Sequence, residues 1–231
     1  MINIKEYLLI DAVESHNLIK KRGYKYFTVN DTNIKETKRR NGEYYTINIS
    51  LLSEEEKIKK VIKKVLRKVL RSNRILSIGL GNEDIMADSF GPLTTSKIIP
   101  SNCYNDFLTL PKVAIFNPKI TSKTGINSYK LIKMVVSDLK PKLILIIDSC
   151  ITKDINNIGH IIEINTAGII RRDAIYNNKD ITKETFNIPV IAILTPTIVN
   201  INNELYTSPY IKDIVTKISN IVSNSINEIL F

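Results

Sequence analysis

Residues 143–149 read LILIIDS, an unbroken apolar run followed at once by an aspartate. Such a run is typical of a strand buried on both faces of a parallel sheet. Four further short apolar runs read as strands: 75–78, 113–116, 160–164 and 190–194. Helical spacing of apolar residues predicts helices at 128–139 and from about 209 onward. The alternation predicts an α/β fold of three layers, with a mainly parallel central sheet, flanking helices and a phosphorylase/hydrolase-like arrangement.

Length and composition predict one globular domain over residues 1–231, because 43% of the residues are hydrophobic and 24% are charged. Residues 53–231 form the expected α/β core. Residues 1–52 form a smaller N-terminal subregion, in which two strand-like stretches, 24–29 and 44–49, flank a polar stretch from Asn30 to Gly42.

Simple counts disfavour membrane-spanning, secreted, disulfide-rich and Cys/His metal-binding proteins. No apolar run reaches the ~18 residues that a membrane span needs, and the N-terminus lacks a basic segment leading into an apolar one. We therefore expect a cytoplasmic protein without a membrane contact. Cysteine and histidine occur only as Cys103, Cys150, His16 and His160, too few for a disulfide framework or a Cys/His metal cluster. No metal and no cofactor is expected.

Much of the net charge of +10 lies in residues 53–72, SEEEKIKKVIKKVLRKVLRS. The apolar residues fall at helical spacing, Ser53 and Glu56 match a capping box, and the acidic start and basic finish suit the helix dipole. The favoured interpretation is an amphipathic helix whose lysines and arginines form a solvated face. A docking surface for an acidic or DNA-bound partner remains the alternative.

Two expected strands end next to an aspartate. The strand at 75–78 runs into the loop 79–92, GLGNEDIMADSFGP, which contains Asp88, and the central run ends at Asp148. Ligands of α/β sheets gather beyond the carboxyl ends of the strands, and neighbouring strands lie about 4.8 Å apart. We therefore expect both carboxylates in one solvent-reachable crevice. The local alternatives are a helix N-cap for Asp88 and a backbone-bonded strand end for Asp148.

A carboxylate pair has a definite chemistry. Two charges about 4 Å apart at an effective dielectric constant near 20 repel by roughly 4 kcal/mol, which separates the two titrations by about three pK units. One acid then stays protonated while the other is ionised, so the pair can activate water and protonate a leaving amine.

A Ser/His or Cys/His hydrolase is less favoured, because neither histidine lies in a suitable motif. A nucleotide site is disfavoured because Asp84 stands where a dinucleotide fingerprint has glycine.

Five sequence blocks between about 74 and 200 occur in an order and spacing that resemble the germination protease family of endospore-forming bacteria. The blocks are Leu76–Asn82, Ala87–Pro92, Ser122–Ile126, Lys140–Ser149 and Thr182–Val199. The chain departs from the family pattern at Glu83, where the family has tryptophan, and at Met86-Ala87, where it has Thr-Pro. A third departure is 166–178, where the family has a second glycine-rich loop.

The resemblance implies an endopeptidase of the spore core that degrades small acid-soluble spore proteins, which coat DNA, during germination. It implies a zymogen with a short propeptide, a homotetramer, and a fold similar to that of hydrogenase-maturation endopeptidases. It places the family's two acidic positions on Asp88 and Asp148. The implied scaffold of the site loop is Gly79, Gly81, Asn82, Gly91, Pro92 and Gly125. Two alternatives stay open: a non-catalytic basic module that binds spore protein or nucleic acid, and a metal-dependent maturation peptidase.

Overall fold

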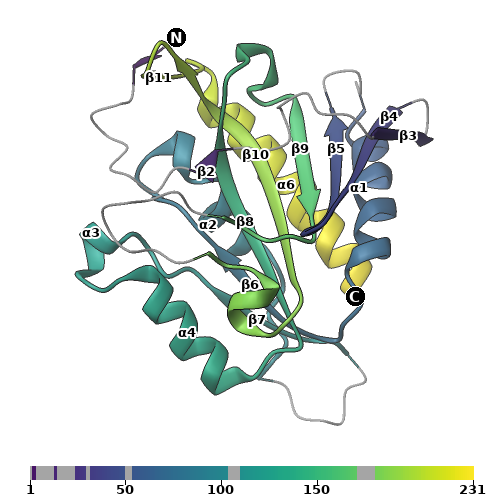
Figure 1. Cartoon of the computed structure of the whole chain (residues 1–231), viewed down its shortest axis with the longest axis vertical. Coiled ribbons are helices and arrows are strands. Elements are labelled where there is room, and N and C mark those ends of the chain that lie inside the picture. The colour runs from purple at the N-terminus through teal and green to yellow at the C-terminus, as the bar shows by residue number, and fades with distance from the viewer. Residues whose placement is uncertain are drawn as a thin grey trace.

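The computed structural model describes residues 2–3, 13–14, 24–29, 32–49, 54–103, 110–170 and 180–231. Within these ranges the chain forms a mixed α/β fold, in which one twisted sheet is flanked by helices (Figure 1). None of the described helices has both the length and the apolar content that a membrane-spanning segment needs.

The centre of the sheet is parallel. Strand β8 (Leu143–Thr152) lies between β10 (Val190–Ile201) and β6 (Arg74–Gly79), and β7 (Lys112–Phe116) pairs with the far edge of β6. These four strands run in the same direction, so their carboxyl ends meet at one edge of the sheet.

The remaining strands make the sheet mixed rather than mainly parallel, which corrects the expectation from sequence. Six of the ten strand pairings in the described chain are antiparallel. Beyond β10, the order is β9 (Ile161–Asn165), β5 (Gly42–Asn48), β4 (Thr32–Arg39) and β3 (Tyr24–Val29). β4 and β5 are joined by a tight turn, and a short connection reverses chain direction, whereas a parallel pair needs a long crossover.

Three short strands complete the described sheet. β11 (Glu204–Thr207) folds back onto β10, and β1 (Ile2–Asn3) pairs with β11, both in antiparallel fashion. β2 (Val13–Glu14) pairs in parallel with Cys150 and Ile151 of β8. An N-terminal strand therefore lies at the carboxyl end of β8, in the part that β6 does not reach.

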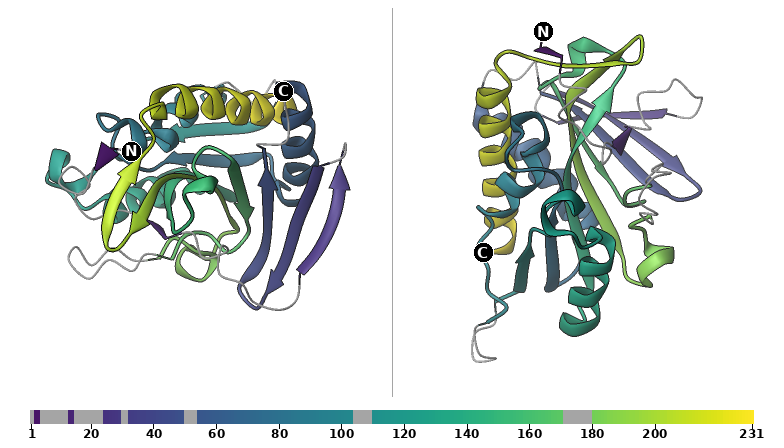
Figure 2. Two further views of the ribbon diagram at one scale, coloured as in Figure 1. Left: turned by 90° about the horizontal axis from the view of Figure 1, so that it is seen from above. Right: turned by 90° about the vertical axis from the view of Figure 1, so that its left-hand side faces the viewer.

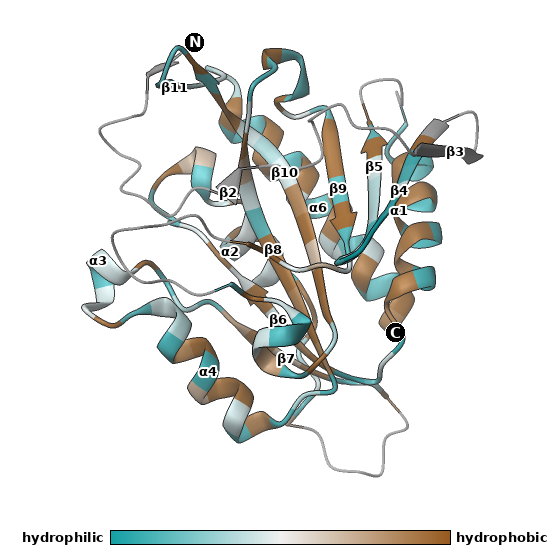
Figure 3. Cartoon of the chain, viewed as in Figure 1, coloured by the Kyte–Doolittle hydropathy of each residue, from teal (hydrophilic) through white to brown (hydrophobic). Residues whose placement is uncertain are grey.

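Helices cover both faces of the sheet (Figure 2). The long helices α1 (Glu55–Val69) and α6 (Ile211–Leu230) share one hydrophobic cluster with α2 (Phe90–Thr95), whereas α4 (Ser128–Leu139) contributes to a second cluster on the other face. Leu145 and Ile147 of β8 belong to the first cluster, and Ile144 and Ile146 to the second. The apolar colour along β8 and its neighbours in Figure 3 marks this doubly buried centre.

Four short helices lie in the connections: the 3-10 helices η2 (Met86–Asp88) and η3 (Ile155–Asn157), α3 (Thr121–Thr124) and α5 (Lys183–Phe186). The N-cap of α1 differs from the capping box expected at Ser53 and Glu56. Its N-cap residue is Glu54, without a side-chain cap hydrogen bond, and Ser53 lies outside the described residues.

Candidate active site

Asp148 lies where β8 extends beyond its neighbour β6. The last residue of β6, Gly79, is in register with Ile147, and the Leu80 N–H donates a 2.9 Å hydrogen bond to the Ile147 carbonyl oxygen. Asp148 is the next residue, and on its other side it is in register with Leu194 of β10. Only 2% of Asp148 is exposed, so its carboxyl group lies inside the fold. The expectation that both carboxylates lie in a solvent-reachable crevice is therefore wrong for Asp148.

Asp88 lies in the loop that follows β6 and stands at the end of η2. Its Oδ2 atom accepts a 2.7 Å hydrogen bond from the Asn82 N–H, so the carboxylate bridges its own loop. The local alternative, in which Asp88 caps the following helix, is wrong, because α2 begins at Phe90 with Ser89 at the cap position. Asp88 is half-buried.

Two glycines allow close backbone contacts, one within this loop and one between the loop and β8. Gly81 has φ of 116°, and a Cβ there would lie 2.0 Å from the Asp88 carbonyl oxygen. A Cβ on Gly91 would lie 2.1 Å from the Leu80 carbonyl oxygen and 2.3 Å from that of Ile147. Both residues must be glycine for the backbones to approach this closely. The contacts lead from Asp88 to Ile147 and thus to the residue before Asp148, so the two acids share one edge of the sheet.

The other expected scaffold residues divide between two places. Gly79 lies against this loop, because a Cβ on it would meet the Gly91 carbonyl oxygen and Asn117 Oδ1, each at 2.5 Å. Asn82 and Pro92 line a cavity of about 10 Å³, roughly the size of one water molecule, together with Asn117 and Lys119. Gly125 is separate from these contacts: it ends α3 with φ of 67°, and nothing lies within 4 Å of a Cβ placed on it.

Two ion pairs hold the loop to the segment around α3. Lys119 Nζ lies 2.7 Å from Glu83 Oε1, and Lys123 pairs with Asp84. The hydrogen bond from Lys119 and its positive charge lower the pKa of Glu83. Glu83 therefore has an ionic partner on the segment after β7. Both acidic partners directly follow Asn82, whose N–H donates a hydrogen bond to the Asp88 carboxylate.

A third carboxylate, which sequence reasoning did not single out, lies on the same face as Asp148. Leu194 is in register both with Asp148 on β8 and with Glu163 on β9, and residues in register point to one face of a sheet. The two acids are thus separated by two strand spacings, about 10 Å. Glu163 is 3% exposed and accepts a 3.2 Å hydrogen bond from Asn165 Nδ2. The available signal was a glutamate inside the apolar run 161–164, IIEI.

The residues of the alternative hydrolase are only partly described. Cys150 is buried beside β2, and the Ser149 hydroxyl is buried. His160 is exposed, with Nδ1 2.9 Å from the Asn156 carbonyl oxygen, and His16 lies outside the described residues. Within the described ranges, no three His, Cys, Asp or Glu side chains are arranged to hold a metal ion.

Of the segment 166–178, the structure describes only residues 166–170. Asn165 Oδ1 accepts hydrogen bonds from the N–H groups of Ala167 and Gly168, and Ile169 forms a bridge with Ile181. Residues 171–179 lie outside the described part of the chain. The described residues 166–170 therefore follow directly on β9, the strand that carries Glu163.

Comparison with known proteins agrees with the sequence blocks. A family model described as germination protease matches residues 3–228. The germination protease of Caldanaerobacter subterraneus subsp. tengcongensis is 30% identical over 174 residues, which cover 69% of this chain and 54% of the relative. That of Oceanobacillus iheyensis is 31% identical over 137 residues, which cover 56% of this chain and 37% of the relative. The chain spans about half the length of these curated relatives or less.

Among solved structures, the NiFe hydrogenase maturation protease HycI from Thermococcus kodakarensis KOD1 is similar to this chain with a TM-score of 0.43 and 18% sequence identity. The match covers 70% of this chain and 98% of that protein. The family model, matched along almost the whole sequence from residue 3 to residue 228, shows that the chain belongs to the germination protease family.

Proposed function

We propose that this chain is an endopeptidase in which Asp88 and Asp148 act as an acid/base pair and water is the nucleophile. The observation that carries the proposal is the link between the two acids. Asp88 holds the loop after β6, and the first residue of that loop, Leu80, donates a hydrogen bond to Ile147, directly before Asp148.

The chemistry follows from two carboxyl groups that share one edge of a sheet. The ionised acid removes a proton from water, which attacks the peptide carbonyl carbon, and the protonated acid donates to the leaving amine. Burial of Asp148 reduces the screening of its charge by bulk water. Membership of the germination protease family supports peptide hydrolysis as the reaction.

The proposed substrates are small acid-soluble spore proteins, and the proposed setting is the spore core. A homotetramer and a removable N-terminal propeptide belong to the same proposal. All four statements derive from membership of the family, and the chain covers about half of the curated relatives' length or less. Cleavage of a purified small acid-soluble spore protein, followed by mass spectrometry of the fragments, tests the substrate class.

The aspartate pair is tested by isosteric substitution. Asp88→Asn and Asp148→Asn should each lower kcat for peptide cleavage by at least about 10²-fold, the usual contribution of a general acid or base. Asp138→Asn is the matched control, because Asp138 is exposed on α4. Circular dichroism checks that all three variants fold. Cleavage at the normal rate by both site variants would refute the pair as the catalytic groups.

The non-catalytic alternative predicts that the unmodified chain cleaves no peptide. It also predicts that ligand binding is unchanged in Asp88→Asn and Asp148→Asn. The metal-dependent alternative needs a set of donors that the described residues do not provide. Activity that survives extensive chelation supports the aspartate pair over that alternative, and activity restored only by a divalent ion contradicts it.

A further inference from the structure

The outward side of α1 carries a line of cations that we call the basic stripe: Lys60, Lys64, Arg67 and Arg71. The first three are spaced four and three residues apart, which places them on one side of the helix, and Arg71 follows the helix end. All four are exposed. α1 lies at an edge of the molecule (Figure 1), and Figure 3 shows hydrophilic residues along it.

The other cations of α1 have acidic partners, whereas those of the basic stripe do not among the described residues. Lys57 pairs with Glu54, and Lys59 and Lys63 both pair with Glu228. Lys68 lies 3.7 Å from Glu36 and stands over the Tyr45 ring. Glu36, Glu54 and Glu228 are thus paired with other lysines of α1, and the positive charge of the basic stripe is available to a binding partner.

The shape of the basic stripe favours a regular, linear polyanion. Successive helical cations are about 4.5–6 Å apart along the axis, and flexible side chains reach the phosphates of a nucleic-acid strand, which recur every 3.4 Å of duplex axis. Insertion into a membrane is not favoured, because an interfacial helix needs exposed apolar residues. The exposed large hydrophobic residues of the described chain all lie outside α1.

We propose that the basic stripe of α1 binds the phosphate backbone of duplex DNA without sequence preference, as a surface separate from the aspartate site. Lysines and arginines that face phosphates supply affinity and orientation but no base recognition. The net charge of +10 assists the approach of the polyanion. The surface would hold the protein on DNA while the aspartate site stays open to another ligand.

The test is the salt dependence of binding, measured by fluorescence anisotropy of the full chain with a labelled duplex of roughly 24 base pairs. Four phosphate contacts predict a slope of log K against log salt near −3.6, so affinity falls about 150-fold between about 50 and 200 mM salt. Lys60→Gln/Lys64→Gln removes two contacts. The expected slope is then about −1.8, with a fall of only about 12-fold.

Lys130→Gln/Lys133→Gln is the matched control, since both lysines are exposed on α4 and the change in net charge is the same. This variant should keep the slope of the unmodified chain, and so should Asp148→Asn. A slope unchanged in Lys60→Gln/Lys64→Gln, or lowered equally in the α4 control, overturns the proposal. So does tighter binding to polyglutamate or to anionic vesicles than to the duplex, because the basic stripe would then serve an acidic protein or a lipid surface.

Discussion

At the scale of single residues, Gly81 is where the backbone of the site loop tolerates no side chain. Gly81→Ala should cost about 2–4 kcal/mol, because the new Cβ meets the Asp88 carbonyl oxygen at a position with positive φ. Peptidase activity should fall with it. Gly125→Ala shares the positive φ but meets nothing within 4 Å, so it should cost only about 1 kcal/mol. Thermal melts of both variants check the difference, and equal melting temperatures would contradict the close approach at Gly81.

Glu163 gives a second residue-scale prediction, which rests on the proposed function. A negative charge about 10 Å from Asp148 disfavours a second negative charge at that position. Glu163→Gln removes the charge and keeps the shape, so the acid limb of the pH–rate profile should move to lower pH. Glu184→Gln, exposed on α5, is the control. A profile that does not move would mean that Glu163 is electrically separate from the site.

At the scale of elements, patterns with strong periodicity were predicted well and polar strands were not. The helix over 128–139 has the predicted bounds, because its apolar residues recur on one face. β4 lies in the stretch interpreted as a polar connection: TNIKETKR has few apolar residues, and the strand exists because β3 and β5 pair with both of its edges. Likewise, the glycine loop and Asp148 could be read from strand ends. Glu163 could not, because its alignment with Asp148 depends on the antiparallel register of β9.

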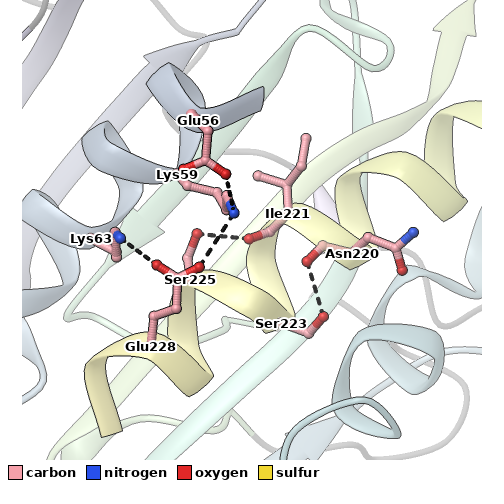
Figure 4. Close-up of polar contacts among 8 residues, drawn as sticks. All are labelled: Glu56, Lys59, Lys63, Asn220, Ile221, Ser223, Ser225 and Glu228. Carbon is pink, nitrogen blue, oxygen red and sulfur yellow. Dashed lines mark hydrogen bonds and ion pairs between the residues drawn. The ribbon is translucent and has the colours of Figure 1, made fainter. Parts of the chain in front are cut away.

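The pairing of α1 with α6 depends in part on one carboxylate (Figure 4). Glu228 of α6 pairs with Lys59, at 3.3 Å, and with Lys63. Hydrogen bonds from these lysines, Lys63 foremost, lower the pKa of Glu228. Because its pKa is depressed in the folded state, the stabilisation is present above the unfolded pKa, near 4.5, and is lost as pH falls through the folded value.

Glu228→Gln should therefore destabilise the protein at pH 7 by about 0.5–1 kcal/mol, since the carboxylate is partly exposed to solvent. That corresponds to a melting temperature lower by about 1–4 °C. As the pH falls below 4.5 and through the depressed pKa of Glu228, the difference between the variant and the unmodified chain should shrink, because protonation removes the charge. Glu55→Gln, on the exposed start of α1, should have little effect across this pH range. A difference in melting temperature that stays constant as the pH falls would assign the effect to packing instead of charge.

At the scale of the whole molecule, the N-terminal strand and the candidate site occupy one edge of the sheet. β6 stops at the level of Ile147, and β2 then takes the adjacent place on β8 at Cys150 and Ile151. An extended peptide in that place pairs through its backbone, the usual way in which a sheet edge accepts a peptide ligand. A substrate strand approaching Asp148 from this side would need the position that Val13 and Glu14 hold.

Removal of residues 1–16 should therefore raise kcat/KM for a peptide substrate, chiefly by lowering KM, because the freed edge of β8 lies two residues from Asp148. A synthetic peptide of residues 9–16, added to the shortened protein, should compete with substrate and restore the lower rate. A scrambled peptide of the same composition should compete less. If the shortened protein folds normally but cleaves no faster, β2 is a structural strand of the sheet and the substrate approaches Asp148 from the side of the Asp88 loop.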